Sequence, residues 1–277
     1  MSRRKQKKSR GRATSQARRA DRYELYEKSV QDPDADIQLI DRIFRNHFDR
    51  RPELLREDFC GTALLARRWV EKRRSNRAWA IDLDPIPLTW GQKHHIGPLR
   101  PDQAARIKLI EGDVLDIGHE KVDVTVAFNF SYFLFRTRPE LLRYFETARA
   151  TLKHEGLLLL DAYGGADSQR TGEEPRPVGG FTYVWDQYTF DPITHSVRNY
   201  IHFKFRDGSK LRRSFRYDWR LWTLPEIQEL LIEAGFSGAD VYWEGTDGGT
   251  DEGNNIFTRR KRALDDPAWI AYIAAVP

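Results

Sequence analysis

A short segment near residue 60 carries residues whose types and spacing could bind a nucleotide. Residues 54–63 read Leu-Leu-Arg-Glu-Asp-Phe-Cys-Gly-Thr-Ala, which predicts a strand, a turn at Gly61 and the start of a helix. A turn with little side-chain bulk lets backbone amides at a helix N-terminus approach a ligand. Asp82 follows Gly61 by 21 positions, at the end of the next expected strand, where a carboxylate can accept both hydroxyls of a ribose. The spacing therefore predicts an adenosine-binding site.

Strands and helices alternate along most of the chain. Apolar runs predict five strands, at residues 54–55, 78–81, 107–110, 122–128 and 156–161. Helical patterns follow the first two strands, and Thr137 and Thr223 each precede a Glu by three residues, which is the capping box of a helix N-terminus. Gly235 is expected to end the second of these helices with a left-handed cap. Strands separated by helices predict an α/β fold, with a mostly parallel sheet and helices on both faces.

Residues 163–218 break this alternation. A loop rich in Gly, Pro and charge is expected at 164–180. Beyond it, apolar side chains recur at every second position, at Phe181, Tyr183 and Trp185 and again at Ile201, Phe203 and Phe205. This period predicts half-buried antiparallel strands. We expect an inserted antiparallel β-layer that lies as a lid over the carboxyl ends of the parallel strands, where ligands bind in open α/β folds.

The positive charge of the chain is concentrated at its start. The 277 residues carry a formal net charge of +5, yet residues 1–22 hold ten Lys and Arg against the single acid Asp21. Residues 1–20 have almost no apolar side chain larger than Ala, so we expect a disordered basic tail. This tail lacks the apolar region of a secretory signal, and no apolar run approaches the ~20 residues of a membrane span. We therefore expect a soluble, cytoplasmic protein with no membrane contact.

The remaining chain divides into two parts. Residues 21–50 show helical spacing of apolar side chains and predict an N-terminal helical lid, and residues 51–277 predict one catalytic domain. Tyr23 and Tyr26 are the candidate substrate or cofactor contacts of this lid. The alternative is that both tyrosines only pack a helix face.

Metal and thiol chemistry have little support in the sequence. Cys60 is the only cysteine, which excludes internal disulfides and any zinc site built on several thiolates. We interpret it as a packing residue. His94 and His95 are adjacent on an expected helix and therefore point in different directions, so we expect no metal site there.

The order of these motifs resembles that of the class I, Rossmann-like S-adenosylmethionine-dependent methyltransferases. The first motif of that family commonly runs acid-x-Gly-Cys-Gly-Thr-Gly. Glu57 falls on the acid and residues 60–62 on the middle of the motif, whereas Phe59 and Ala63 stand where the family has its first and last glycines. The sequence of residues 56–63, Arg-Glu-Asp-Phe-Cys-Gly-Thr-Ala, is similar to a variant of this motif found in uncharacterised bacterial methyltransferases.

The resemblance implies a fold, a cofactor and a set of site residues. The implied fold is a mostly parallel seven-stranded sheet with the inserted β-layer, and the implied cofactor is S-adenosyl-L-methionine. The family pattern places Asp82 on the ribose, Asp113 beside the adenine amino group and Asn129 near the methionine moiety. The expected cofactor-binding residues are Glu57, Phe59, Cys60, Gly61, Asp82, Leu83, Asp113, Val114 and Asn129.

The segment after the fourth expected strand bears on the acceptor. Residues 128–133 read Phe-Asn-Phe-Ser-Tyr-Phe, without the Asn-Pro-Pro-Tyr pattern of many base and amide N-methyltransferases, and resemble the Asn-x-Ser-aromatic region of small-molecule methyltransferases. We expect Asn129 and Tyr132 to act at the reacting centre, with Tyr132 orienting the acceptor. The alternative is that Tyr132 is a core aromatic. A general base is needed only if the acceptor must lose a proton before attack.

Three functions fit these patterns, and a small-molecule methyltransferase fits best. An RNA or ribosomal-protein methyltransferase would use the basic residues 1–22 for a weak nucleic-acid contact. A non-catalytic S-adenosylmethionine-binding protein is suggested by Phe59 and Ala63. A dinucleotide dehydrogenase is disfavoured, because the turn has one glycine where pyrophosphate binding uses a Gly-x-Gly-x-x-Gly set.

Overall fold

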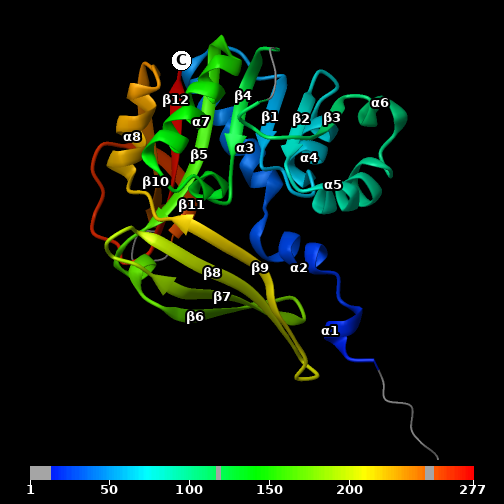
Figure 1. The fold of residues 1–277 in the computed structure, drawn as a ribbon. Coiled ribbons are helices and arrows are strands. Elements are labelled where there is room, and N and C mark those ends of the chain that lie inside the picture. The colour runs from blue at the N-terminus through cyan, green and yellow to red at the C-terminus, as the bar shows by residue number, and fades with distance from the viewer. Residues whose placement is uncertain (1–13, 117–119, 247–252) are drawn as a thin grey trace, which may run out of the picture.

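The protein contains a large mixed sheet and a small antiparallel sheet, which lie one below the other in Figure 1. This computed structural model describes residues 14–116, 120–246 and 253–277. Helices cover the large sheet, whereas the small sheet is joined to it through the N-terminal helices and the ends of the large strands.

The large sheet confirms the predicted α/β architecture. Its strand order is β11-β10-β12-β5-β4-β1-β2-β3. The parallel strands are β1 (Leu54–Asp58), β2 (Arg77–Asp82), β3 (Ile107–Glu111), β4 (Val122–Ala127) and β5 (Leu152–Gly164). The antiparallel pairs add β10 (Gly238–Thr246), β11 (Gly253–Arg260) and β12 (Trp269–Val276). Among the described residues the sheet therefore has eight strands instead of the expected seven, because β11 returns alongside β10 as a hairpin.

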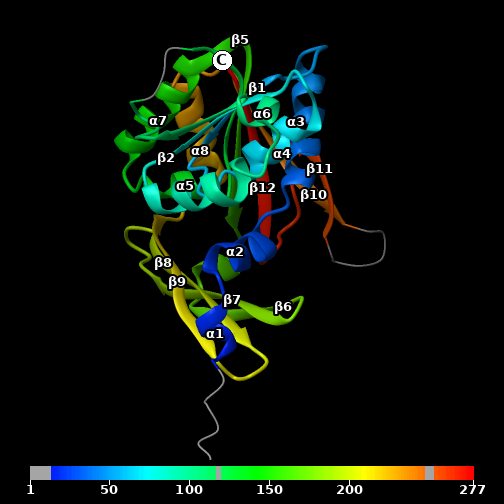
Figure 2. The ribbon, with the colours of Figure 1, turned by 90° about the vertical axis from the view of Figure 1, so that its right-hand side faces the viewer.

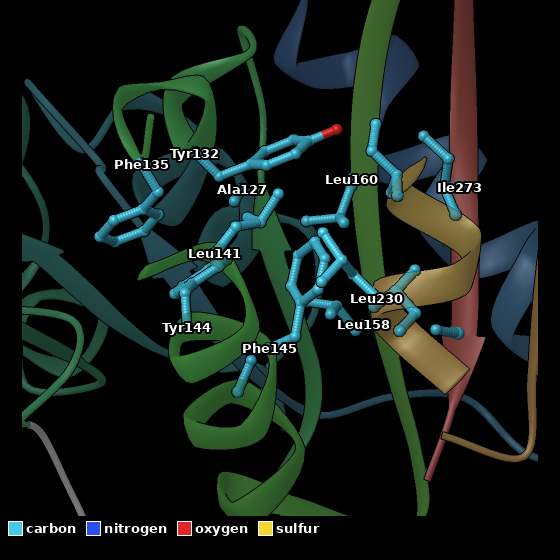
Figure 3. Close-up of a cluster of buried hydrophobic side chains, with 14 of the residues drawn as sticks. Ala127, Tyr132, Phe135, Leu141, Tyr144, Phe145, Leu158, Leu160, Leu230 and Ile273 are labelled. Atoms are coloured by element: carbon cyan, nitrogen blue, oxygen red, sulfur yellow. The ribbon is translucent and has the colours of Figure 1, made fainter. Parts of the chain in front are cut away.

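Helices pack on both faces of the large sheet. One face holds α3 (Pro33–His47), α4 (Leu64–Lys72) and α5 (Pro85–Gly91), which continues as η1 (Gln92–Ile96), and the short α6 (Pro101–Ala104) lies before β3. The other face holds α7 (Arg138–Thr151) and α8 (Leu224–Glu233). Alternate residues of β5 enter the two cores: Leu158 and Leu160 pack with Phe145 and Leu230 in Figure 3, and Leu159 packs on the opposite face.

The predicted capping boxes are present. Thr137 and Glu140 cap α7 reciprocally, and Thr223 and Glu226 do the same for α8. Gly235 follows α8 at a φ of 92°, in the left-handed region that glycine adopts without strain. The spacing of Thr and Glu in the sequence therefore predicted the start of both helices correctly.

The inserted β-layer forms the small sheet, with strand order β6-β7-β8-β9. Its strands are β6 (Gly172–Val178), β7 (Phe181–Phe190), β8 (Ser196–Phe205) and β9 (Lys210–Arg220). The expected loop at 164–180 is wrong over β6, because Pro175 and Pro177 suggested irregular backbone. Proline lacks an N–H donor, but β6 is an edge strand that pairs with β7 alone, so the sheet accommodates both prolines.

The N-terminal segments bridge the two sheets. After α1 (Gln16–Arg19), α2 (Arg22–Val30) lies between the large and small sheets in Figure 2. The expectation of disorder over residues 1–20 is wrong for α1, because two of its amides find acceptors on the β8–β9 turn: Gln16 N donates to Asp207 Oδ2 (2.7 Å) and Ala17 N to Ser209 Oγ (3.0 Å). The other expected tail residues, 1–13, lie outside the described residues. In the described part of the chain, no helix has the length and apolar character to cross a membrane.

Candidate active site

Two neighbouring cavities open where the parallel strands end. The first, the strand-end cavity, has a volume of about 560 Å³ and is lined by the turn after β1, the end of β2, α2 and β9. The second, the aromatic cavity, has a volume of about 510 Å³ and lies between the ends of β5, β10 and β12 and the small sheet. Four residues line both cavities: Tyr26, Asn129, Tyr217 and Trp219.

The turn after β1 is wound in a left-handed conformation. Phe59, Gly61 and Ala63 have φ values of 58°, 53° and 58°. Phe59 and Ala63 therefore adopt the backbone shape for which the related motif uses glycine, and they do so at a cost of about 1 kcal/mol each. Gly61 N donates to Asp82 Oδ2 over 2.7 Å, so the turn closes onto the acid at the end of β2. The sequence analysis predicted that both residues belong to one site, and the structure adds a direct hydrogen bond between them.

Phe59 and Cys60 hold this turn in place by packing. The Phe59 ring contacts Phe135 and Tyr144, at centroid distances of 6.1 and 5.7 Å. Cys60 is buried, its backbone N–H donates to Ile81 O, and burial raises the pKa of its thiol well above the ordinary value. A thiol that stays protonated is a poor nucleophile, so the structure agrees with packing as the role of Cys60.

Carboxylates surround the strand-end cavity. Glu57 is buried, its Oε2 accepts from Ala66 N at the start of α4 (2.9 Å), and burial raises its pKa to about 8. Burial also raises the pKa of Asp36 to about 8 and the pKa of Asp82 above its ordinary value. Asp58 instead forms a buried ion pair with Arg56 at 2.7 Å. Near neutral pH, Glu57 and Asp36 therefore keep a proton in the ligand-free protein, and the cavity can both donate and accept hydrogen bonds.

Helix α2 is hydrogen-bonded to the turn after β1. Glu27 Oε1 accepts from Thr62 Oγ1 over 2.6 Å and lies 2.7 Å from His95 Nε2. On the same face of α2, Tyr23 and Tyr26 both contact Phe215 of β9, at centroid distances of 6.0 and 4.9 Å. The helix thus ties the turn to the small sheet.

Glu27 was missed in the sequence analysis, although a signal for it existed. It lies four residues after Tyr23, on the helical face that Tyr23 and Tyr26 also occupy. His94, the neighbour of His95, stacks on Trp90 at 4.2 Å. The same Trp90 ring lies edge-on to His95 at 5.2 Å, so the two histidines share this neighbour, while His95 also contacts Glu27.

The turn after β4 separates the two cavities. Asn129 and Phe130 both have a φ of 58°, which is a strained conformation for residues with a Cβ. The buried Asp161 carboxylate stabilises it: Oδ2 accepts from Asn129 N (2.7 Å) and Oδ1 from Phe130 N (2.8 Å). Burial raises the pKa of Asp161 to about 7. Asp161 is a positioning residue that the sequence analysis placed at a strand end without assigning it a role.

Tyr132 does not face either cavity. It lies on η2 (Ser131–Leu134), is fully buried among the side chains drawn in Figure 3, and donates from its hydroxyl to the backbone O of Asp161 over 2.9 Å. The expectation that Tyr132 orients the acceptor is therefore wrong. The left-handed Phe130 turns the chain so that Tyr132 points into the core.

Three predicted cofactor residues lie outside the lining of both cavities. Leu83 is 68% exposed, Val114 is buried with its carbonyl accepting from Arg56 Nη2, and Asp113 Oδ1 accepts from Leu115 N over 2.9 Å. The predicted residues that do line the strand-end cavity are Tyr23, Tyr26, Glu57, Phe59, Cys60, Gly61, Asp82 and Asn129.

The sheet order and the turn after β1 together define the class of fold: it is the Rossmann-like fold of the S-adenosylmethionine-dependent methyltransferases. A methyltransferase of this kind from Clostridium acetobutylicum is 16% identical and superposes with a TM-score of 0.63, over 92% of this chain and 96% of that one. The amino pentose methyltransferase CalS10 from Micromonospora echinaspora, with S-adenosylmethionine bound, is 14% identical with a TM-score of 0.64, over 93% and 98%.

A third solved structure covers this chain completely. The sugar N-methyltransferase KedS8 from a Streptoalloteichus species is 16% identical and has a TM-score of 0.61, over 100% of this chain and 98% of that one. In sequence, the chain matches no protein-family model and no curated protein. The similarity to these solved structures is therefore one of fold.

Proposed function

We propose that this protein is an S-adenosylmethionine-dependent methyltransferase that acts on a small-molecule acceptor. The observation that carries the proposal is that two cavities of suitable size meet at Asn129, one at the end of β1 and β2 and the other under the inserted sheet. Methyl transfer by in-line displacement requires donor and acceptor to be held end to end, away from water. Two cavities that share a wall satisfy this requirement.

The residues of the strand-end cavity fit the cofactor. S-adenosylmethionine supplies a methyl group activated by a sulfonium, and it carries two ribose hydroxyls and an ammonium group that need acceptors. Asp82 would accept from the hydroxyls, while the positive charges of the bound ligand would lower the raised pKa values of Glu57 and Asp36 and so favour their charged forms. Asn129 would stand near the methionine moiety, because it lines both cavities. Tyr23 and Tyr26 would cover the ligand from α2.

The activities given in the names of the structural neighbours support a small-molecule acceptor. Among them are an amino pentose methyltransferase, a sugar N-methyltransferase and a glycopeptide N-methyltransferase. A cavity of about 510 Å³ suits an acceptor of similar scale. The reaction that we propose is transfer of one methyl group to such a molecule.

Calorimetric titration with S-adenosylmethionine tests the proposal. We expect binding to the wild type and about 10- to 100-fold weaker binding to Asp82→Asn, because charged hydrogen bonds to the ribose are lost. Asn retains one oxygen, which can accept from Gly61 N and keep the turn closed, while the bond from Asp84 N to the other oxygen is lost. Asp102→Asn, at an exposed ion pair on α6, is the matched control and should leave binding unchanged.

NAD should not bind in the same titration. If the wild type bound NAD but not S-adenosylmethionine, the methyltransferase proposal would be wrong and only the fold would stand. Binding of S-adenosylmethionine that is equal in wild type and Asp82→Asn would remove Asp82 from the site.

A further inference from the structure

The walls of the aromatic cavity are unusually rich in flat rings. Nine of its lining residues are aromatic, and four of them are tryptophans: Trp185, Trp219, Trp243 and Trp269. Trp219 lies 4.4 Å from Tyr217 and 6.2 Å from Trp185 between ring centroids, and Trp243 lies 5.1 Å from Trp269. Faces of this kind bind flat apolar surfaces and, through their quadrupoles, cations.

The polar groups of this cavity are acidic. Four carboxylates line it, from Asp167, Glu174, Glu244 and Asp266, whereas its described lining contains no Lys, Arg or His. Asp167 is already paired with Arg170 at 2.7 Å. The other three form no ion pair with a described cation, so their charge is available to a ligand.

Neutral hydrogen bonds hold these carboxylates in place. Gln187 Nε2 donates to Glu174 Oε1 over 3.2 Å, and Asn255 N donates to Glu244 Oε1 over 2.7 Å. Ala268 N donates to Asp266 Oδ1 over 3.0 Å. Each carboxylate keeps a second oxygen for another donor. The side chains are thus oriented while their negative charge remains.

We propose that the aromatic cavity takes an acceptor that carries a basic amine beside a flat apolar ring, with Glu174 and Glu244 recognising the ammonium. This inference rests on the proposed function, because it names the acceptor of the same site. The rings attract the cation from their faces, and the carboxylates attract it by charge. The same charges disfavour acceptors that bear a carboxylate or a phosphate, since no described cation would pair with them.

Three indole probes of similar size and different charge test this specificity by calorimetry. Tryptamine carries an ammonium, tryptophol a hydroxyl in its place, and indole-3-propionate a carboxylate. With S-adenosylhomocysteine present, we expect tryptamine to bind at least about tenfold more tightly than tryptophol, in line with one charged hydrogen bond. We expect no measurable binding of indole-3-propionate.

The double variant Glu174→Gln/Glu244→Gln should lose most of the preference for tryptamine over tryptophol, and the aromatic rings and Asp266 account for what remains. Gln keeps the oxygens that accept from Gln187 and Asn255 but removes the charge. Glu173→Gln is the matched control. Glu173 is adjacent on β6, pairs with Lys204 outside the cavity, and should leave the tryptamine preference unchanged.

Two sets of outcomes separate this inference from the proposed function. If S-adenosylhomocysteine binds but tryptophol or indole-3-propionate binds as tightly as tryptamine, or none of the three binds, the acceptor inference is overturned and the methyltransferase proposal stands. If tryptamine keeps its preference in the same samples without any binding of S-adenosylhomocysteine, the proposed function fails and the cavity specificity stands. Equal effects of Glu173→Gln and the double variant would also overturn the assignment of the two carboxylates.

Discussion

The strand-end cavity and the aromatic cavity share a wall but are built in different ways. One part of the first comes from residues 57–82, where the left-handed turn after β1 closes onto Asp82, and α2 and β9 supply other walls. The second combines rings from α2, β5, the small sheet, β10 and β12, which are distant in sequence. The comparison teaches that a site shaped by backbone can be predicted from local spacing, whereas a site shaped by side chains depends on the complete fold.

The largest effect is expected at the turn after β4, which lies between the two cavities. Asp161→Ala removes the acceptor of two buried N–H groups, those of Asn129 and Phe130. We expect it to lower the free energy of unfolding by about 3 kcal/mol, since each unsatisfied buried donor costs 1–3 kcal/mol. Ligand binding in both cavities should weaken together. Urea denaturation and the two calorimetric titrations measure these effects.

Asp161→Asn is the matched variant for this turn. It keeps one acceptor oxygen, so its loss of stability should be about half that of Asp161→Ala. If Asp161→Ala weakened binding in only one cavity, the turn would serve that cavity alone.

The acidity of the strand-end cavity predicts a pH dependence. Burial raises the pKa of Glu57 from 4.5 to about 8, so the folded chain keeps a proton that the unfolded chain has lost. The free energy of unfolding of the ligand-free protein then falls as pH rises from about 4.5 to about 8. At about 1.4 kcal/mol per pH unit, we expect Glu57 to contribute a loss of about 2 kcal/mol between about pH 5 and pH 6.5, to which the raised pKa values of Asp36 and Asp161 add. Urea denaturation at each pH gives the slope.

Glu57→Gln isolates this contribution. Gln can still accept from Ala66 N, but it has no proton to lose. The variant should therefore lose less stability than the wild type over the same interval. Identical slopes for the two proteins would show that Glu57 is ionised in the folded state.

Tyr132→Phe gives the smallest expected effect. It removes one buried hydrogen bond, to the carbonyl of Asp161, and should lower the free energy of unfolding by about 1 kcal/mol. Because Tyr132 lines neither cavity, methyl transfer should proceed at the wild-type rate. A tenfold or larger fall in turnover with unchanged stability would place the hydroxyl back at the reacting centre.

Prediction from sequence succeeded where a feature depends on residues that are close together in the sequence. The capping boxes at Thr137 and Thr223 each depend on a spacing of three residues, and both are present. Strand β6 was missed because the tolerance of a strand for Pro depends on its place in the sheet. The direction of Tyr132 could not be read from its spacing, because the left-handed turn that precedes it is stabilised by Asp161, more than 30 residues away.

The aromatic cavity was outside the reach of the same reasoning. Period-two alternation identified strands in the inserted sheet, and Trp185 belongs to that pattern. However, Trp243 and Trp269 come from the C-terminal strands, and only the antiparallel pairing of β12 with β5 and β10 brings them to this place. Alternation indicates which side chains share a face of a sheet but not what lies opposite that face.

The position of α2 has a consequence for the kinetics of ligand exchange. Tyr26 lines both cavities and Glu27 accepts a hydrogen bond from Thr62 of the turn after β1, so under the proposed function a displacement of α2 would open both cavities. We therefore expect the methylated product and the spent cofactor to leave in one release event, with a common rate. A turnover limited by that event would respond to solvent viscosity and to substitutions in α2, even where the chemical step is untouched.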